Sequence, residues 1–272
     1  MIHYTDRIWR LMSDIVGRVP TLKFLDMDRV LVFARSGRAQ AEGPYATCHC
    51  LSLPDSEPGY YYWRDRRTGL LTRRSEWFVT KSPVVKIGTT KIDYMVSFAL
   101  PRFCDQHLAK SPKEAHYAGF ENWITKLDTV VHELYHIDPE HAGIRRMERA
   151  DGTASAHCHG QHFFKNVVTM VKEYLATDPD PEVYGFLRHD FGELTAQFGG
   201  VIGTTFANYP SYPQRYIEAV TPQPAATEQD CIVEPLKPSR LAKVFTEDDL
   251  VIREFLPRTS RRLVRKGAFR AA

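Results

Sequence analysis

The chain has 272 residues, of which 43% are apolar and 25% are charged, so it has the length and apolar content of a globular protein with a full core. Its formal net charge of +3 is too small to indicate a nucleic-acid-binding protein by itself. The 5 cysteines follow no regular spacing and form no CxxC pair, which argues against a disulfide framework, a zinc finger or a zinc ribbon.

The first hundred residues predict one helix followed by a small sheet. Residues 4–17 place Ile8, Leu11 and Ile15 on one helical face, after an N-cap at Thr5. Strands are expected where β-prone residues are bounded by turn residues, at 29–35, 45–53, 60–63, 76–80 and 93–100. We expect these strands to form a small, antiparallel-type sheet.

Helices are expected in the middle of the chain. The segment 120–137 has an apolar stripe, because its large apolar residues recur at alternating steps of four and three, and Asp138-Pro139 ends it. Further helices are expected near 161–176 and 182–199. The predicted fold class is therefore α+β, with an N-terminal helix, a small sheet and then several helices.

The chain changes in composition near residue 220. Residues 1–220 are expected to form the folded domain, and 221–272 a Pro-rich linker and a basic tail that contains a short helix capped at Thr246. The run at 258–270 is strongly basic, and such an end is most often a solvated, mobile terminus. The alternative is a weak contact with the phosphates of a nucleic acid.

The residues from His132 to His136 read HELYH and fit the pattern HExxH. Residues four apart lie on one face of a helix, so both imidazoles can reach one metal ion. Glu133 lies about 100° round the helix from His132 and can address a water molecule at that metal. Zinc lowers the pKa of such a water to about 7, and Glu133 would take its proton and pass one to the leaving amine.

A catalytic zinc ion needs a third protein ligand and one open position. The metzincin pattern fails, because it requires Gly and His where this chain has Pro139 and Ala142. Carboxylates on later helices are one source of a third ligand, namely Glu173, Glu182 and Glu193. The run before the helix at 161–176 is another source and contains three histidines, His157, His159 and His162.

At these motifs the chain resembles known zinc peptidases. HELYH followed by HGQHF at 159–163 is similar to the HExxH…HGxxF pattern of SprT-like and Spartan-like peptidases, and HELYHI with IRR at 144–146 resembles a family of phage metallopeptidases. The resemblance covers about residues 1–215 and implies zinc-dependent hydrolysis of peptide bonds in a peptide or protein substrate. It also implies the roles of individual residues: His132, His136 and His159 as metal ligands, Glu133 as general base and Phe163 as a packing residue.

Several alternatives stay open. His157 and His162 are rivals of His159 as the third ligand. A DNA-associated protease that uses the basic tail is another interpretation, although the chain lacks the C-terminal cysteine-pair zinc module of SprT proteins. A zinc-stabilised binding module without turnover is a third, and it would require His157 or Cys158 in the fourth metal position.

Two expectations concern the surroundings of the metal. The strand at 93–100 is expected to lie at the edge of the sheet, where an extended peptide could pair with it. Cys48 and Cys50 alternate along a strand, and we interpret them as buried thiols rather than a metal-binding pair. Four tyrosines are candidate donors to an oxyanion, although packing is the more common role: Tyr135, Tyr209, Tyr212 and Tyr216.

The sequence also predicts a location. The N-terminus lacks the apolar region of a signal peptide, and no run approaches the roughly 18 apolar residues of a membrane span. We therefore expect a cytoplasmic protein without a membrane partner, located in the host cytoplasm if it is phage-encoded.

Overall fold

The computed structural model describes residues 1–37, 43–51, 61–65, 67–68, 83–109, 111, 113–140, 143–145, 158–208, 213, 231–235, 244–257 and 261–266. In 61–65, 231–235 and 261–266 the description covers the backbone alone. Within these residues helices and several small sheets occur together, which confirms the expected α+β class.

The described α-helices are α1 (Tyr4–Arg18), α2 (Ile124–Tyr135), α3 (Gln161–Ala176), α4 (Pro181–Tyr184) and α5 (Phe191–Phe198). The helix expected at 182–199 is divided into α4, a 3-10 turn at Gly185–Arg188, and α5. The division occurs because Asp190 starts a new helix, in which Asp190 and Glu193 cap each other's backbone N–H groups. None of the described helices is both long and apolar enough to cross a membrane.

The described strands are β1 (Ile2–His3), β2 (Val30–Gly37), β3 (Ala46–Cys50), β4 (Tyr61–Asp65), β5 (Val84–Ile87), β6 (Thr90–Ile92), β7 (Tyr94–Pro101), β8 (Val201–Phe206), β9 (Cys231–Pro235), β10 (Val244–Phe245), β11 (Leu250–Phe255) and β12 (Arg261–Lys266). Their orders are β1-β8-β11-β12, β10-β5-β6, β2-β7-β3 and β4-β9. The sheet β2-β7-β3 is mixed rather than antiparallel, because β2 runs parallel to β7 and β3 runs antiparallel to it.

The expectation that 93–100 forms an edge strand is wrong. This segment is β7, which lies between β2 and β3 and is buried along its whole length. A continuous apolar run is typical of a strand with both faces covered, and it indicates a central position. Among the described residues, β3 is the edge strand on the side of the helices.

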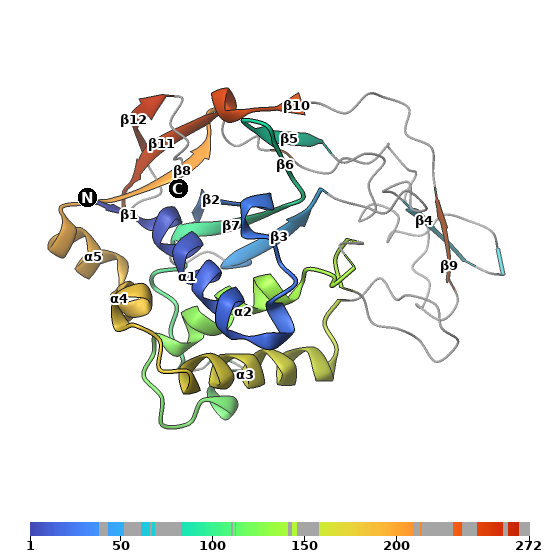
Figure 1. The fold of residues 1–272 in the computed structure, drawn as a ribbon, viewed down its shortest axis with the longest axis horizontal. Helices are drawn as coiled ribbons and strands as arrows, with labels where there is room; N and C mark the ends of the chain where they lie inside the picture. The colour runs from blue at the N-terminus through green and yellow to red at the C-terminus, as the bar shows by residue number, and fades with distance from the viewer. Residues whose placement is uncertain are drawn as a thin grey trace.

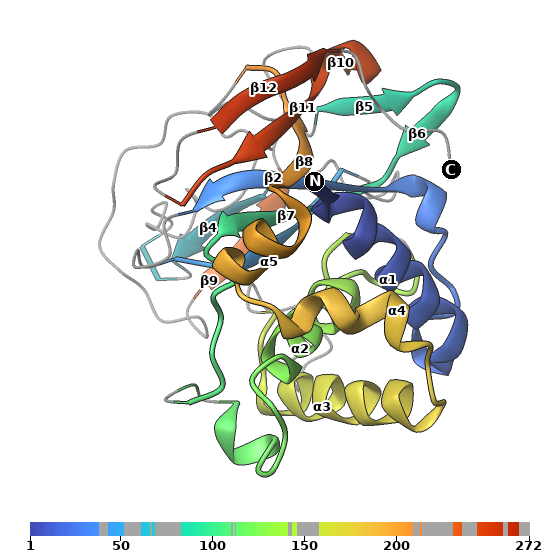
Figure 2. The same ribbon diagram turned by 90° about the vertical axis from the view of Figure 1, so that its left-hand side faces the viewer.

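Both faces of this sheet are covered. Figures 1 and 2 show α1, α2 and α3 on one side and β8, β11 and β12 on the other. Alternate residues of one strand enter two different cores: Val30 and Val32 of β2 pack with the helices, whereas Leu31 and Phe33 pack with Met95, Phe206 and Leu250 on the other side. The core on the helical side fixes α2 beneath β3.

The region that the sequence predicts as linker and basic tail contains strands. β11 pairs with β8 on one side and with β12 on the other, and Leu250, Val251 and Phe255 are buried. The basic run is partly β12, which is an edge strand of its sheet, and charged residues are common on edge strands because they oppose aggregation. The basic composition of this run therefore did not indicate that part of it forms a strand. The short helix expected after Thr246 is present as one 3-10 turn, Glu247–Asp249.

Candidate metal centre

Helix α2 positions two of the predicted ligands. It lies between the β2-β7-β3 sheet and α3, and most of its residues are buried. Its last turn holds His132 and Glu133, and His136 follows as the C-cap, where its backbone N–H donates to the carbonyl of His132 at 3.2 Å. The two histidines are therefore one helical turn apart on the same face.

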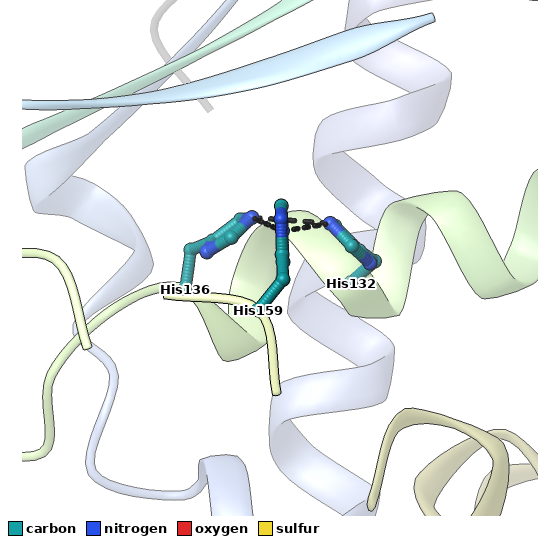
Figure 3. Close-up of side chains that lie close together, drawn as sticks. All are labelled: His132, His136 and His159. Atoms are coloured by element: carbon teal, nitrogen blue, oxygen red, sulfur yellow. Dashed lines mark hydrogen bonds between the residues drawn. The ribbon is translucent and has the colours of Figure 1, made fainter. Parts of the chain in front are cut away.

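His159 approaches the same point from the start of α3. It lies just before the N-cap Gly160, whose backbone is extended, and α3 begins at Gln161. Figure 3 shows the three rings directed at one another, and their Nε2 atoms form a triangle with sides of 3.1, 3.0 and 3.0 Å. The structure thus brings together His132, His136 and His159 as a group that could hold a metal ion.

Hydrogen bonds alone do not account for this triangle. Each Nε2 atom has either a proton or a lone pair. At least one of the three pairs must therefore place two donors or two acceptors against each other, which is not a hydrogen bond. The Nδ1 atom of His136 is also buried and finds no hydrogen-bond partner among the described residues. A single cation would satisfy all three Nε2 atoms at once, and imidazole is a common ligand of transition metals. The donor set therefore fits a metal ion.

Burial keeps His132 and His136 neutral, which leaves their lone pairs available. The pKa of His132 falls to about 2, first because the ring is buried and then because His136 and His159 are close. The pKa of His136 falls to about 3, through burial and then through His159 and Arg145.

Glu133 lies beside these rings and is buried. Burial raises the pKa of Glu133 to about 8, while the backbone N–H of Cys48 and the charges of Lys113 and Arg35 act in the opposite direction. A cation held by the histidines would also favour the ionised carboxylate. A carboxyl group with a pKa near neutrality can both accept and return a proton, as a general base requires.

We expect the metal-free protein to be most stable near pH 6.5. His132 and His136 have lowered pKa values, so below about pH 6.5 the unfolded chain binds protons that the folded chain does not, and the free energy of unfolding falls. Glu133 acts in the opposite direction, because from about pH 4.5 to 8 the folded chain retains a proton that the unfolded chain has released. Below pH 6.5 the effect of the two histidines on the free energy of unfolding exceeds that of Glu133, so stability falls as the pH falls. Above pH 6.5 Glu133 has the larger effect, so stability falls as the pH rises.

The measurement is the thermal midpoint of the metal-free protein between about pH 5 and 8.5. In Glu133→Gln the decline from pH 6.5 to 8 should disappear, whereas the decline at acidic pH should stay. An unchanged decline above pH 6.5 in this variant would assign that decline to another group.

The metal centre opens into a cavity of about 430 Å³. It is lined by residues of α2, by the start of β3 and by residues from Cys158 into the first turn of α3. The lining residues are Pro44, Tyr45, Ala46, Thr47, Cys48, Lys113, Thr129, His132, Glu133, His136, Ile144, Cys158, His159 and Phe164. A metal ion at this position would therefore be accessible to a ligand that enters between β3 and α3.

Lys113 is a cavity residue that no sequence motif indicates. Its Nζ lies 2.6 Å from Asp128 and 2.8 Å from the hydroxyl of Thr129. Asp128 is buried and also accepts a hydrogen bond of 2.6 Å from the hydroxyl of Tyr117. Because Asp128 lies one turn before His132 on α2, this network holds the helical face that presents the metal centre.

Among the residues that the structure describes, none of the other candidate ligands joins the histidine group. His162 is exposed and is not part of the histidine group, and His157 lies outside the described residues. Cys158 lines the cavity but does not join the group, and the carboxylates Glu173, Glu182 and Glu193 are exposed. Cys50 is buried in β3, as interpreted from the sequence, whereas Cys48 is half-buried and faces the cavity.

Tyr135, one of the tyrosines proposed as oxyanion donors, does not line the cavity. The hydroxyl of Tyr135 accepts a hydrogen bond of 2.7 Å from Asn166, and its ring packs 4.8 Å from Phe163 with the guanidinium of Arg145 over it at 4.2 Å. Tyr135 is thus a packing residue. The other three, Tyr209, Tyr212 and Tyr216, lie outside the described residues. Tyr45 does line the cavity, although no motif marks it.

The resemblance to SprT-like peptidases implies metal-ligand roles for His132, His136 and His159 and a general-base role for Glu133. These roles stay predictions. No protein family, no curated protein and no solved structure matches the chain.

Proposed function

We propose that the chain is a zinc-dependent metallopeptidase. The observation that supports this best is the convergence of His132, His136 and His159 next to the buried carboxyl group of Glu133, in a cavity bordered by an edge strand. Three histidines from two segments are a common ligand set of catalytic zinc, since they leave one coordination position open. Zinc would supply Lewis acidity, which makes water nucleophilic near neutral pH and polarises a carbonyl group.

Glu133 would move the protons of the reaction. Its carboxylate would accept a proton from the attacking water and donate one to the nitrogen of the leaving amine. The backbone N–H of Cys48 donates to this carboxylate and so restricts its orientation. Proton acceptor and metal ligands are then fixed relative to one another, which lowers the entropic cost of reaching the transition state.

The edge of β3 provides a place for an extended substrate. Ala99 donates from its N–H to the carbonyl of Tyr45 at 2.9 Å, and Leu51 donates to Asp93 at 2.7 Å, so the odd-numbered residues of this segment pair with β7. In an antiparallel pair the alternate residues then direct their N–H and C=O groups away from the partner strand. Ala46 therefore presents its N–H and Cys48 its C=O group at this edge, where a peptide could add as a further strand. The N–H of Cys48 is held by Glu133, and the carbonyl of Ala46 also accepts from the hydroxyl of Thr47 at 2.8 Å.

Removal of the metal tests this proposal. Treatment of the purified protein with ortho-phenanthroline should abolish cleavage of an unfolded protein such as reduced casein, and added zinc should restore it, because the ligands bind metal reversibly. The non-chelating meta isomer is the control and should have no effect.

Two results would contradict the proposal. Cleavage that persists in metal-free protein would exclude a role for the metal in turnover. A protein that binds zinc tightly but cleaves nothing would instead support a zinc-stabilised binding module.

A further inference from the structure

Phe164 is an exposed aromatic residue at the metal centre. Phe164 is 44% exposed and lines the cavity. Its ring stacks on His159 with centroids 5.5 Å apart and an interplanar angle of 27°, and it lies 6.0 Å from the ring of His132. One face of Phe164 therefore covers a ligand while much of the ring remains accessible.

The neighbouring Phe163 already performs the packing role at this site. It is 5% exposed and lies 5.0, 4.9 and 5.0 Å from the rings of His132, His136 and His159. The three imidazoles are thus supported by Phe163 from the core. Phe164 adds a stacking contact to His159, and that contact does not account for the apolar surface that Phe164 leaves accessible.

Other residues that line the cavity are also apolar. Tyr45, Ala46 and Ile144 also line it. Among the lining residues that the structure describes, Lys113 is the one charged residue besides Glu133, and its ammonium group is engaged by Asp128 at 2.6 Å. Such walls do not recognise a charged side chain, whereas they would bury an apolar one.

We propose that Phe164 is a specificity-determining residue whose ring receives a bulky apolar side chain of the substrate. This proposal rests on the proposed peptidase function. One residue of an extended chain spans about 3.3 Å. A ring 5.5 Å from His159 is therefore within reach of a residue adjacent to the scissile bond, and too close for one several positions away.

Binding to an inactive variant tests the proposal without turnover. The protein is zinc-loaded Glu133→Gln, and the probes are acetyl-Ala-Ala-Leu-Ala-Ala-amide and the same peptide with Ser in place of Leu. Each peptide can bind in several registers, including the one that places its central residue against Phe164. The position of that residue relative to the scissile bond therefore need not be known beforehand. We expect the Leu peptide to bind about 10-fold more tightly.

The second substitution is Phe164→Ser in the same background, in which the two peptides should bind within about 2-fold of each other. Phe120→Ser is the matched control, because Phe120 is 42% exposed and does not line the cavity. It should keep the 10-fold preference. Phe164→Trp retains an aromatic ring against His159, and it should keep a preference for Leu because its apolar surface remains. Zinc content is measured for every variant.

The outcomes separate this proposal from the proposed function. An unchanged preference for Leu in Phe164→Ser would overturn the role of Phe164, and cleavage of the Leu peptide by the wild type would leave the peptidase proposal intact. If the zinc-loaded wild type cleaves neither peptide and Glu133→Gln binds neither, both proposals are overturned.

Discussion

Replacement of Glu133 by Gln should reduce kcat for peptide cleavage by about 10²–10⁴-fold while zinc content remains unchanged. The amide has the same size as the carboxyl group, and its oxygen can still accept the hydrogen bond from the backbone of Cys48. It cannot take a proton from water, so the loss should appear in kcat rather than in KM. Turnover is measured with a quenched fluorescent peptide, and zinc by elemental analysis of the same sample.

Glu121→Gln is the matched control for this experiment. Glu121 lies just before α2, its side chain is 67% exposed, and it pairs with Arg188 at 3.1 Å. Loss of one surface ion pair should change stability very little and leave kcat unchanged. Equal activity of Glu133→Gln and wild type would exclude Glu133 as the general base.

Replacement of His159 by Ala should weaken zinc binding by more than about 100-fold, because even partners that only orient a ligand contribute 10–100-fold. Its Nε2 atom lies 3.0 Å from those of both His132 and His136, so no other group of the described site occupies its place. Affinity is measured by competition with a fluorescent zinc chelator. Cleavage at saturating zinc should also fall to the background.

His162→Ala is the control here, since His162 is exposed and lies only three residues further along the chain. It should bind zinc as the wild type does. The ligand assignment would be overturned if His159→Ala retained wild-type affinity, and a loss of affinity in His157→Ala or His162→Ala would then identify the true third ligand.

The grouping of His132 and His136 was predictable from the sequence because these residues follow a local rule. HExxH places two imidazoles on one helical face through spacing alone, and the apolar stripe of 120–137 predicted the helix that became α2. The choice of His159 depended on a resemblance, not on spacing, and it became geometrically distinct only when α3 packed against α2. The cavity residues Tyr45, Lys113 and Phe164 come from three separate segments, and no local pattern marks them.

The errors in the fold have a common cause. Strand β7 was expected at an edge and β12 in a mobile tail, because both interpretations used the composition of a segment without its partners. A strand's position in a sheet is decided by pairing between segments far apart in the chain, such as β11 with β8. Such pairing is not encoded in any short window of sequence.

The pairing of β11 affects how the basic C-terminal region should be studied. β8 is bonded to β1 at one end of the chain and to β11 near the other, so a single sheet joins segments from both ends. Deleting residues 258–272 would remove β12 and expose the backbone of β11 along one side, which invites aggregation. Lost DNA binding in such a truncated protein would therefore be ambiguous, and exchange of single arginines for glutamine is the sounder way to ask what these charges do.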